Sequence, residues 1–218
     1  MYSKKFMCLT ATANKKTTRK IIQLLHLRNH KITRLSPEKP NVKISVKKLK
    51  QGTDLRYRGK AVGMFHSHTP QELKEIVMKE FSKNNGKCFI VVATSALGMG
   101  VNIRNIRHVI HVGLPSDVEA YIQELGRAGR DGDQSSAFLF YRPCDIAHNA
   151  DEELVRIIKN KEEKCRRAAL LKCFNEVPDN DFDNEKHKCC DECENMCNCD
   201  ECAVPKEEIT PPAKIEKC

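Results

Sequence analysis

Two arginines, Arg127 and Arg130, lie three residues apart in the glycine-rich segment 123–132 (QELGRAGRDG). A guanidinium is a planar and permanently charged donor, so it suits a phosphate chain whose negative charge grows during transfer. An arginine used in this way accelerates phosphoryl transfer by roughly 10³- to 10⁵-fold. The spacing therefore predicts a turn that faces a nucleotide. The alternative interpretation is a turn whose arginines only pair with surface carboxylates.

A helix is expected to position this turn. Pro115 sets the entry of the chain, and Ser116 to Glu119 has the pattern of a capping box. In that pattern Ser116 accepts from the amide of Glu119, and the Glu119 side chain reaches back to Ser116. Gly126 and Gly129 should then end the helix and let both guanidinium groups point in one direction.

Short apolar runs upstream and downstream predict a parallel sheet. The β-branched run 89–93 is interpreted as a buried parallel strand, and further strands are expected over 64–68, 107–113 and 138–141. The amphipathic stretch 71–81 predicts a helix between two of them. The loop 94–102 follows the carboxyl end of a predicted strand, which is where α/β sheets bind ligands.

These segments resemble the RecQ branch of the superfamily 2 helicases. Segment 123–132 is similar to motif VI, 94–102 to motif V and 6–13 to motif III. DEAD-box RNA helicases usually carry His at the position of Gln123, so DNA is the favoured substrate. The resemblance implies an α/β fold: an incomplete RecA-like helicase C-terminal lobe with a parallel sheet, followed by a small helical zinc-binding module. It also implies ATP-driven 3′-to-5′ translocation along DNA, with unwinding in replication, recombination and repair.

The resemblance assigns a role to each matching residue. Arg127 and Arg130 would be catalytic, and two threonines of segment 6–13, Thr10 and Thr12, would couple nucleotide state to movement. The implied ATP-binding residues are Gln123, Gly126, Gly100 and Asn102, and the implied DNA-binding residues are Thr94, Ser95 and Met99. The family usually has Asp at the position of Asn102, so the contact of that carboxylate with the nucleotide sugar or the arginine turn would be lost.

A motor of this class also needs a P-loop, G-x-x-x-x-G-K-[ST], to hold the phosphates of ATP beside Mg²⁺. The sequence contains no such pattern, and the family's motif IV region falls in an apparent gap between about Leu49 and Lys60. We therefore expect no ATP hydrolysis by the chain alone and a P-loop-bearing lobe as its partner. The competing interpretation is a catalytically inactive, zinc-stabilised nucleic-acid-binding fragment.

The 12 cysteines indicate metal binding if the compartment is reducing. A helix over 163–174 would bring Cys165 to the pair Cys190-x-x-Cys193, as in a closed tetrahedral zinc site. The resemblance to the RecQ zinc subdomain gives the Zn²⁺ ligands as Cys165, Cys189, Cys190 and Cys193. Competing ligands are Cys173, Cys197, Cys199 and Cys202, of which the last three either bind a second metal or form a thiol-rich tail.

The charges are unevenly spread along a chain whose formal net charge is +9. Residues 1–60 hold 17 Lys and Arg against two acids, whereas residues 176–202 hold ten Asp and Glu against two lysines. The basic part favours contact with DNA, either single-stranded or at duplex junctions. The sequence has no apolar run of ~18 residues, so no membrane span is expected. The expected location is the nucleus in a eukaryote and the cytoplasm otherwise.

Residues 15–27 predict a helix with Ile21, Ile22, Leu24 and Leu25 on its apolar side.

The sequence patterns divide the chain into four expected parts. The expected division is 1–35 for a remnant of a first RecA-like lobe, 36–143 for the C-terminal lobe, 144–202 for the zinc module and 203–218 for a disordered tail.

Overall fold

The computed structural model describes residues 13–34, 36–49, 62–83, 85–94, 103–147, 150–160, 164–177 and 185–203. Within these ranges the strands pair only in parallel. Strands β1 (Val42–Lys48), β5 (Ser135–Tyr141) and β4 (His108–Val112) form one sheet in the order β1-β5-β4. Strands β2 (Val62–Phe65) and β3 (Ile90–Ala93) form a second sheet. The parallel α/β architecture predicted from the sequence is confirmed.

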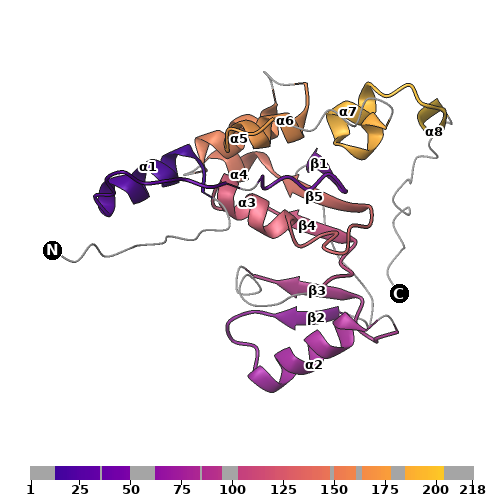
Figure 1. Cartoon of the computed structure of the whole chain (residues 1–218). Helices are drawn as coiled ribbons and strands as arrows, with labels where there is room; N and C mark the ends of the chain where they lie inside the picture. The colour runs from indigo at the N-terminus through magenta and orange to yellow at the C-terminus, as the bar shows by residue number, and fades with distance from the viewer. Residues whose placement is uncertain are drawn as a thin grey trace.

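Helices surround the two sheets as Figure 1 shows. Helix α2 lies along β2 and β3, while α3 lies beside the three-stranded sheet and α5 and α6 lie near it on the far side from β2 and β3. Helices α7 and α8 lie at the end occupied by β1. The helices are α1 (Lys15–Leu24), α2 (Gln71–Ser82), α3 (Val118–Leu125), α4 (Pro143–Ala147), α5 (Glu152–Lys159), α6 (Arg166–Lys172), the 3-10 helix η2 (Lys186–Lys188), α7 (Asp191–Asn195) and α8 (Asp200–Ala203).

One hydrophobic core joins the lobe to the cysteine-rich module. Alternate residues of β1 and β5 point into it, because side chains on a strand alternate between faces. Buried core members come from β1, β5, α3, α5, α6 and the cysteine-rich segment: Val42, Ile44, Ala137, Leu139, Val118, Tyr121, Ile122, Leu125, Leu154, Ile157, Ile158, Ala169, Leu170, Cys189, Cys190 and Cys193. The burial of apolar side chains in this core therefore stabilises the lobe and the cysteine-rich module together.

Helix α1 forms where expected and buries none of its residues, with Leu24 78% exposed. The predicted burial of strand β3 is wrong: the strand is parallel as predicted, but Val92 is 50% exposed. Strand β3 stays exposed because its sheet is small: among the described residues only β2 pairs with it, and α2 packs against this pair of strands.

Helix α1 is fixed at its start. The Asn14 side chain accepts from the amide of Thr17, which caps the helix, and the Asn14 amide donates to Glu119 Oε1 at 2.9 Å. This second bond connects α1 to α3. None of the helices in the described ranges is both long and apolar enough to cross a bilayer.

Candidate functional site

The helix before the arginine turn is capped by Asp117, and the predicted Ser116 cap is wrong. Asp117 Oδ1 accepts from the amide of Ala120 at 2.7 Å, and Ser116 Oγ donates to the other Asp117 oxygen at 3.0 Å. Glu119 does not reach back to Ser116, because its Oε1 accepts from the amide of Asn14. A carboxylate is the better acceptor at a positive helix start, so the cap lies one residue later than predicted.

The turn after α3 depends on Gly129. Its φ is +59°, and a Cβ there would lie 2.3 Å from Asn41 Nδ2. Asn41 donates to the carbonyl oxygens of Gly129 at 2.8 Å and Asp133 at 2.9 Å, so the turn closes directly on this amide. Gly126, the C-cap residue that follows α3, has an ordinary φ of −64°. The role of Asn41 was not predicted, since it lies far away in sequence.

The acidic residues of the turn interact with Arg107. Arg107 donates to both carboxylate oxygens of Asp131 at 2.8 and 2.7 Å and to Asp133 at 2.6 Å. The hydrogen bond from Arg107 is the main reason that the pKa of Asp131 is lowered. This arginine, directly before β4, therefore engages the carboxylates that lie nearest to Arg130 in sequence.

Arg127 and Arg130 lie within electrostatic reach of each other. Arg130 is exposed and Arg127 is partly buried. Burial first, and then the positive charge of Arg130, lower the pKa of Arg127, while Glu124 opposes them. The structure therefore brings together two cationic groups just after a capped helix that also carries Gln123 and ends at Gly126.

Of the other residues predicted to contact ATP or DNA or to couple the two, the structure describes only Thr94. Thr94 is exposed just after β3, and its amide donates to the carbonyl of Phe65 at 3.3 Å. Six predicted residues lie outside the described residues: Thr10, Thr12, Ser95, Met99, Gly100 and Asn102.

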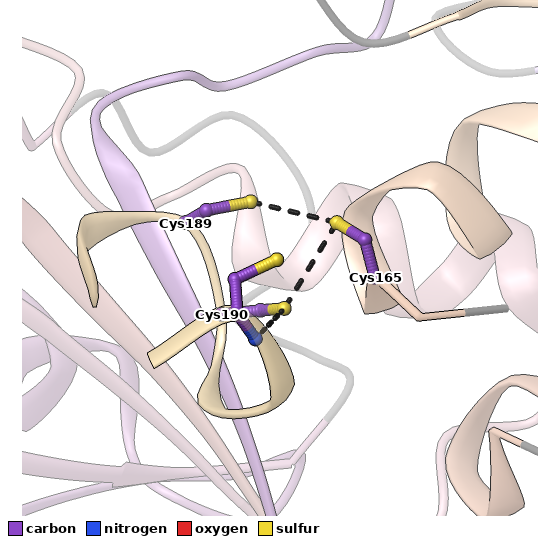
Figure 2. A group of neighbouring side chains, drawn as sticks. Cys165, Cys189 and Cys190 are labelled. Atoms are coloured by element: carbon purple, nitrogen blue, oxygen red, sulfur yellow. Dashed lines mark hydrogen bonds between the residues drawn. The ribbon is translucent and has the colours of Figure 1, made fainter. Parts of the chain in front are cut away.

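The cysteines of the module form two groups. The first is the predicted set, Cys165, Cys189, Cys190 and Cys193, whose sulfur atoms all lie within 4.8 Å of one another. Figure 2 shows Cys165, at the start of α6, facing Cys189 and Cys190 across a short gap. The Cys165 sulfur is 3.6 Å from that of Cys189 and 4.0 Å from that of Cys190.

This first group fits a tetrahedral metal site. With Zn–S bonds of ~2.3 Å, four sulfurs around one zinc lie about 3.8 Å apart. Hydrogen bonding with Cys165, and then with Cys189, lowers the pKa of Cys190, and the amide of Cys193 donates to the Cys190 sulfur at 3.5 Å. Burial raises the pKa of Cys193. Four soft sulfur donors in a largely buried, closed arrangement can hold Zn²⁺ in a structural role.

Cys173 does not join either group. Its sulfur donates to the carbonyl of Ala169 within α6, and burial raises the pKa of this thiol to about 12. The other three competing cysteines, Cys197, Cys199 and Cys202, gather around His187 instead. His187 was not among the ligands predicted from the sequence. Its signal was a histidine two residues before Cys189 in a cysteine-rich segment.

Arg167 connects the cysteine-rich module to the sheet. Its side chain is buried and donates to the carbonyls of Lys39 at 2.6 Å, Val42 at 2.7 Å and Cys189 at 3.3 Å. Its Nε donates to the Cys189 sulfur at 3.4 Å, and such outer contacts orient metal ligands. The amide of Ile44 donates to Cys189 O at 3.1 Å, so the module covers the free edge of β1.

Arg166 holds the module together from within. It donates to Asp191 Oδ1 at 2.6 Å, to Glu192 Oε1 at 2.8 Å and to the carbonyl of Ile158 at 2.7 Å. One guanidinium therefore satisfies the end of α5 and binds the first two acids of α7. The pair of arginines after Cys165 acts within the module through Arg166 and toward the lobe through Arg167.

Replacing Arg167 by methionine is expected to lower the free energy of unfolding by about 1–3 kcal/mol. The change nearly keeps the volume of the side chain but removes this donor from the buried carbonyl of Val42, while the part-buried carbonyl of Lys39 still accepts from the amide of Val42. Urea unfolding measures the loss, and hydrogen exchange at the amide of Ile44 reports on the docking itself.

The matched control is Arg156→Met on α5. The Arg156 guanidinium is exposed and 3.7 Å from Glu153, so its loss should cost no more than ~0.5 kcal/mol. Equal stability of the two variants, with unchanged exchange at Ile44, would contradict the docking role of Arg167.

A basic hollow lies between α1 and the pair α5 and α6. It has a volume of about 430 Å³. Cationic residues dominate its lining: Lys15, Lys16, Arg19, Lys20, Arg156 and Lys172. This surface suits a phosphate backbone, and only the tertiary structure brings α5 and α6 to α1.

Comparison with known proteins shows that the chain is similar to helicases. The family model described as helicase conserved C-terminal domain matches residues 14–132. ATP-dependent DNA helicase Q-like 2 of Arabidopsis thaliana is 36% identical over 71% of this chain and 21% of its own length. ATP-dependent DNA helicase RecQ of Pasteurella multocida is 29% identical over 93% of this chain and 37% of its own length. The chain thus spans well under half the length of these relatives.

Two further proteins are similar to this chain. A protein of Acanthamoeba polyphaga mimivirus, described as a putative ATP-dependent RNA helicase, is 29% identical over 88% of this chain and 42% of its own length. Among solved structures, a DEAD box protein from Methanococcus jannaschii has a TM-score of 0.38 and 22% identity, covering 65% of this chain and 35% of that chain.

Proposed function

Because this chain belongs to the helicase conserved C-terminal domain family, in its RecQ branch, we propose that it supplies the arginine-bearing lobe of an ATP-driven 3′-to-5′ DNA helicase. In this role Arg130, supported by Arg127, stabilises the charge that develops on the γ-phosphate of ATP held by a P-loop-bearing lobe. That lobe belongs either to a longer form of this protein or to a partner.

The observation that carries the proposal is the rigid arginine turn. Asp117 caps the preceding helix, Asn41 binds the turn backbone, and Arg107 engages Asp131 and Asp133. These contacts support a preorganised pair of guanidinium groups, which loses little entropy when an anion arrives. Preorganised positive charge is the contribution that catalysis of phosphoryl transfer needs from this lobe.

Other residues of the chain have supporting roles in the proposal. Gln123, one helical turn before Arg127, positions the phosphate, and the backbone of Gly126 allows its approach. Gly100 and Asn102 contact the nucleotide, and Thr94, Ser95 and Met99 contact DNA. Thr10 and Thr12 couple the two events. Bound Mg²⁺ and the P-loop supply the remaining charge neutralisation.

The first cysteine group has a structural role in the proposal. Cys165, Cys189, Cys190 and Cys193 hold Zn²⁺, which stabilises the module that covers β1. The division into a remnant at 1–35, a lobe at 36–143, a zinc module at 144–202 and a tail at 203–218 belongs to the same proposal, as do action in replication, recombination and repair and a nuclear location in a eukaryote.

The experiment that tests this function is a DNA-stimulated ATPase assay. The chain is measured alone and then with the P-loop-bearing lobe of a RecQ relative, either mixed or fused. The proposal expects turnover only in the combined protein, together with 3′-to-5′ unwinding of a tailed duplex. A combined protein that binds DNA without turnover would contradict it.

A second candidate function is passive nucleic-acid binding by a zinc-stabilised fragment. The basic hollow beside α1 favours it, because phosphate contact there requires no ATP. Binding to DNA by the chain alone, without turnover in any combination, supports this candidate. The mimivirus relative makes an RNA strand of the same sequence the natural comparison.

Basic residues of the hollow should determine the salt dependence of binding. Replacing both Arg19 and Lys20 by glutamine is expected to lower the slope of log K against log salt by about 1.4 on a single strand. The reason is that each lost phosphate contact removes about 0.7 of a released counterion. Fluorescence anisotropy with a labelled oligonucleotide at several salt concentrations measures the slope.

The control variant carries Lys74→Gln and Lys79→Gln on α2, which lies beside the other sheet. It removes the same total charge from the chain. A slope that falls equally in both variants would indicate a general charge effect and contradict a role for the hollow.

A further inference from the structure

A second group of metal-type ligands lies next to the first along the chain. His187 comes from η2, Cys197 and Cys199 follow α7, and Cys202 lies on α8. One ligand atom from each of these four side chains lies within 4.8 Å of every other. The four residues are neither fully buried nor fully exposed.

The distances within this group fit tetrahedral coordination. His187 Nδ1 is 3.2 Å from the Cys199 sulfur and 3.6 Å from the Cys197 sulfur, and these two sulfurs are 3.5 Å apart. Around one zinc with bonds of ~2.3 Å to sulfur and ~2.0 Å to nitrogen, such atoms lie about 3.5–3.8 Å apart. The observed separations are therefore close to those that a bound ion would impose.

The imidazole of His187 is oriented as in a metal ligand. Its Nδ1 faces the sulfurs, and its Nε2 lies 3.1 Å from Glu201 Oε2, which is an ion-pair distance. The Nδ1 atom, which faces the sulfurs, is the ring nitrogen placed to bind a metal, while Nε2 has the Glu201 carboxylate near it but no hydrogen-bond partner among the described residues. The Glu201 carboxylate comes from α8, the same short helix that carries Cys202.

A disulfide explains this arrangement less well. The sulfurs of Cys197 and Cys199 are 3.5 Å apart, well beyond the ~2.05 Å of a bonded pair. A single disulfide among three cysteines would also leave one thiol and the oriented imidazole without a role. Three sulfurs with one imidazole nitrogen are instead a common donor set for structural zinc.

We propose that His187, Cys197, Cys199 and Cys202 form a second zinc site, separate from that of Cys165, Cys189, Cys190 and Cys193. The two sites alternate along the chain, because His187 serves one and Cys189, two residues later, serves the other. The second ion fixes α8 against η2. Lys43 of β1 forms an ion pair at 2.7 Å with Glu194 on α7, the helix that lies between the ligands of the two sites along the chain.

The test is a count of metal ions on the whole chain. Native mass spectrometry after purification with Zn²⁺ should give two zinc ions per chain, and Cys199→Ser should give one. The retained first ion shows that this variant is still folded. Cys144→Ser and His68→Asn, which change an exposed cysteine and an exposed histidine outside both groups, should keep two.

A second variant identifies the ligand set. His187→Cys should keep two ions and convert the site from three sulfurs and one nitrogen to four sulfurs, which cadmium-113 NMR resolves as a shifted signal. The proposal is overturned by one zinc per wild-type chain that persists in Cys199→Ser. It is also overturned by two ions that persist in Cys199→Ser, by a His187→Cys spectrum without change, or by a chain mass lower by two hydrogens with two thiols lost to a disulfide.

Discussion

Replacing Arg130 by alanine should lower ATP hydrolysis by about 10³-fold or more in a motor assembled from this chain and a P-loop-bearing lobe. The reason is that the guanidinium acts on charge that appears only in the transition state. Its loss therefore lowers kcat, while the KM for ATP changes little. Steady-state phosphate release at saturating DNA measures both constants.

Two further variants make this prediction specific. Arg130→Lys keeps the charge but loses the planar fork, so it should recover only a small part of the activity. Arg142→Ala removes an exposed arginine after β5 and should leave kcat unchanged. If Arg130→Ala retains the wild-type kcat while DNA binding persists, the catalytic assignment is wrong.

The second large effect is expected from Cys190→Ser, which removes a sulfur from the first cysteine group. Structural zinc contributes an apparent ~10–16 kcal/mol to the folding of small zinc domains. Cys190 is fully buried in the core shared by the module and the lobe. We therefore expect the variant to lose the first zinc ion and to unfold its cysteine-rich module.

The measurement combines zinc content with hydrogen exchange. The amide of Ile44, which donates to Cys189 O, should lose its protection in Cys190→Ser, whereas the amide of Ala137, paired within the sheet, should change less. The control is Cys144→Ser, an exposed cysteine on α4. A Cys190→Ser chain with unchanged zinc content and unchanged exchange at Ile44 would remove the zinc assignment.

The cysteine-rich module affects the lobe through strand β1. Strand β1 pairs with β5 along one edge and receives the Cys189–Cys190 segment along the other. An uncovered edge strand is open to pairing with other chains. The module therefore protects the lobe, and removal of its metal should increase aggregation as well as lower stability.

Most local structure could be predicted from the sequence. The helices at 15–24, 71–82 and 166–172 and the strands at 90–93 and 108–112 lie where periodicity placed them. These elements follow from short windows, because side-chain spacing and helix-ending glycines act within a few residues. The grouping of Cys165 with Cys189, Cys190 and Cys193 also agrees with the prediction, since the resemblance supplied the long-range part.

Strand β1 and the burial of β3 could not be predicted in this way. The run Val42–Lys48 alternates apolar and polar residues too briefly to stand out, and its neighbours in space are β5 and the cysteine segment. The run over β3 reads as buried, yet burial depends on what other segments cover it. The pairing of β1 and the exposure of β3 therefore depend on other segments and cannot be read from either strand alone.

The sequence by itself determined the chemistry that this protein carries: paired guanidinium groups after a helix, a basic first part and a cysteine-rich end. Only the tertiary structure decided the partners, such as Asn41 and Arg107 at the arginine turn, Arg167 at the sheet edge and His187 among the second set of cysteines. The physical reason is range. Residue type and helix or strand preference act locally, whereas hydrogen bonds and metal-type clusters require segments that meet only after the core has formed.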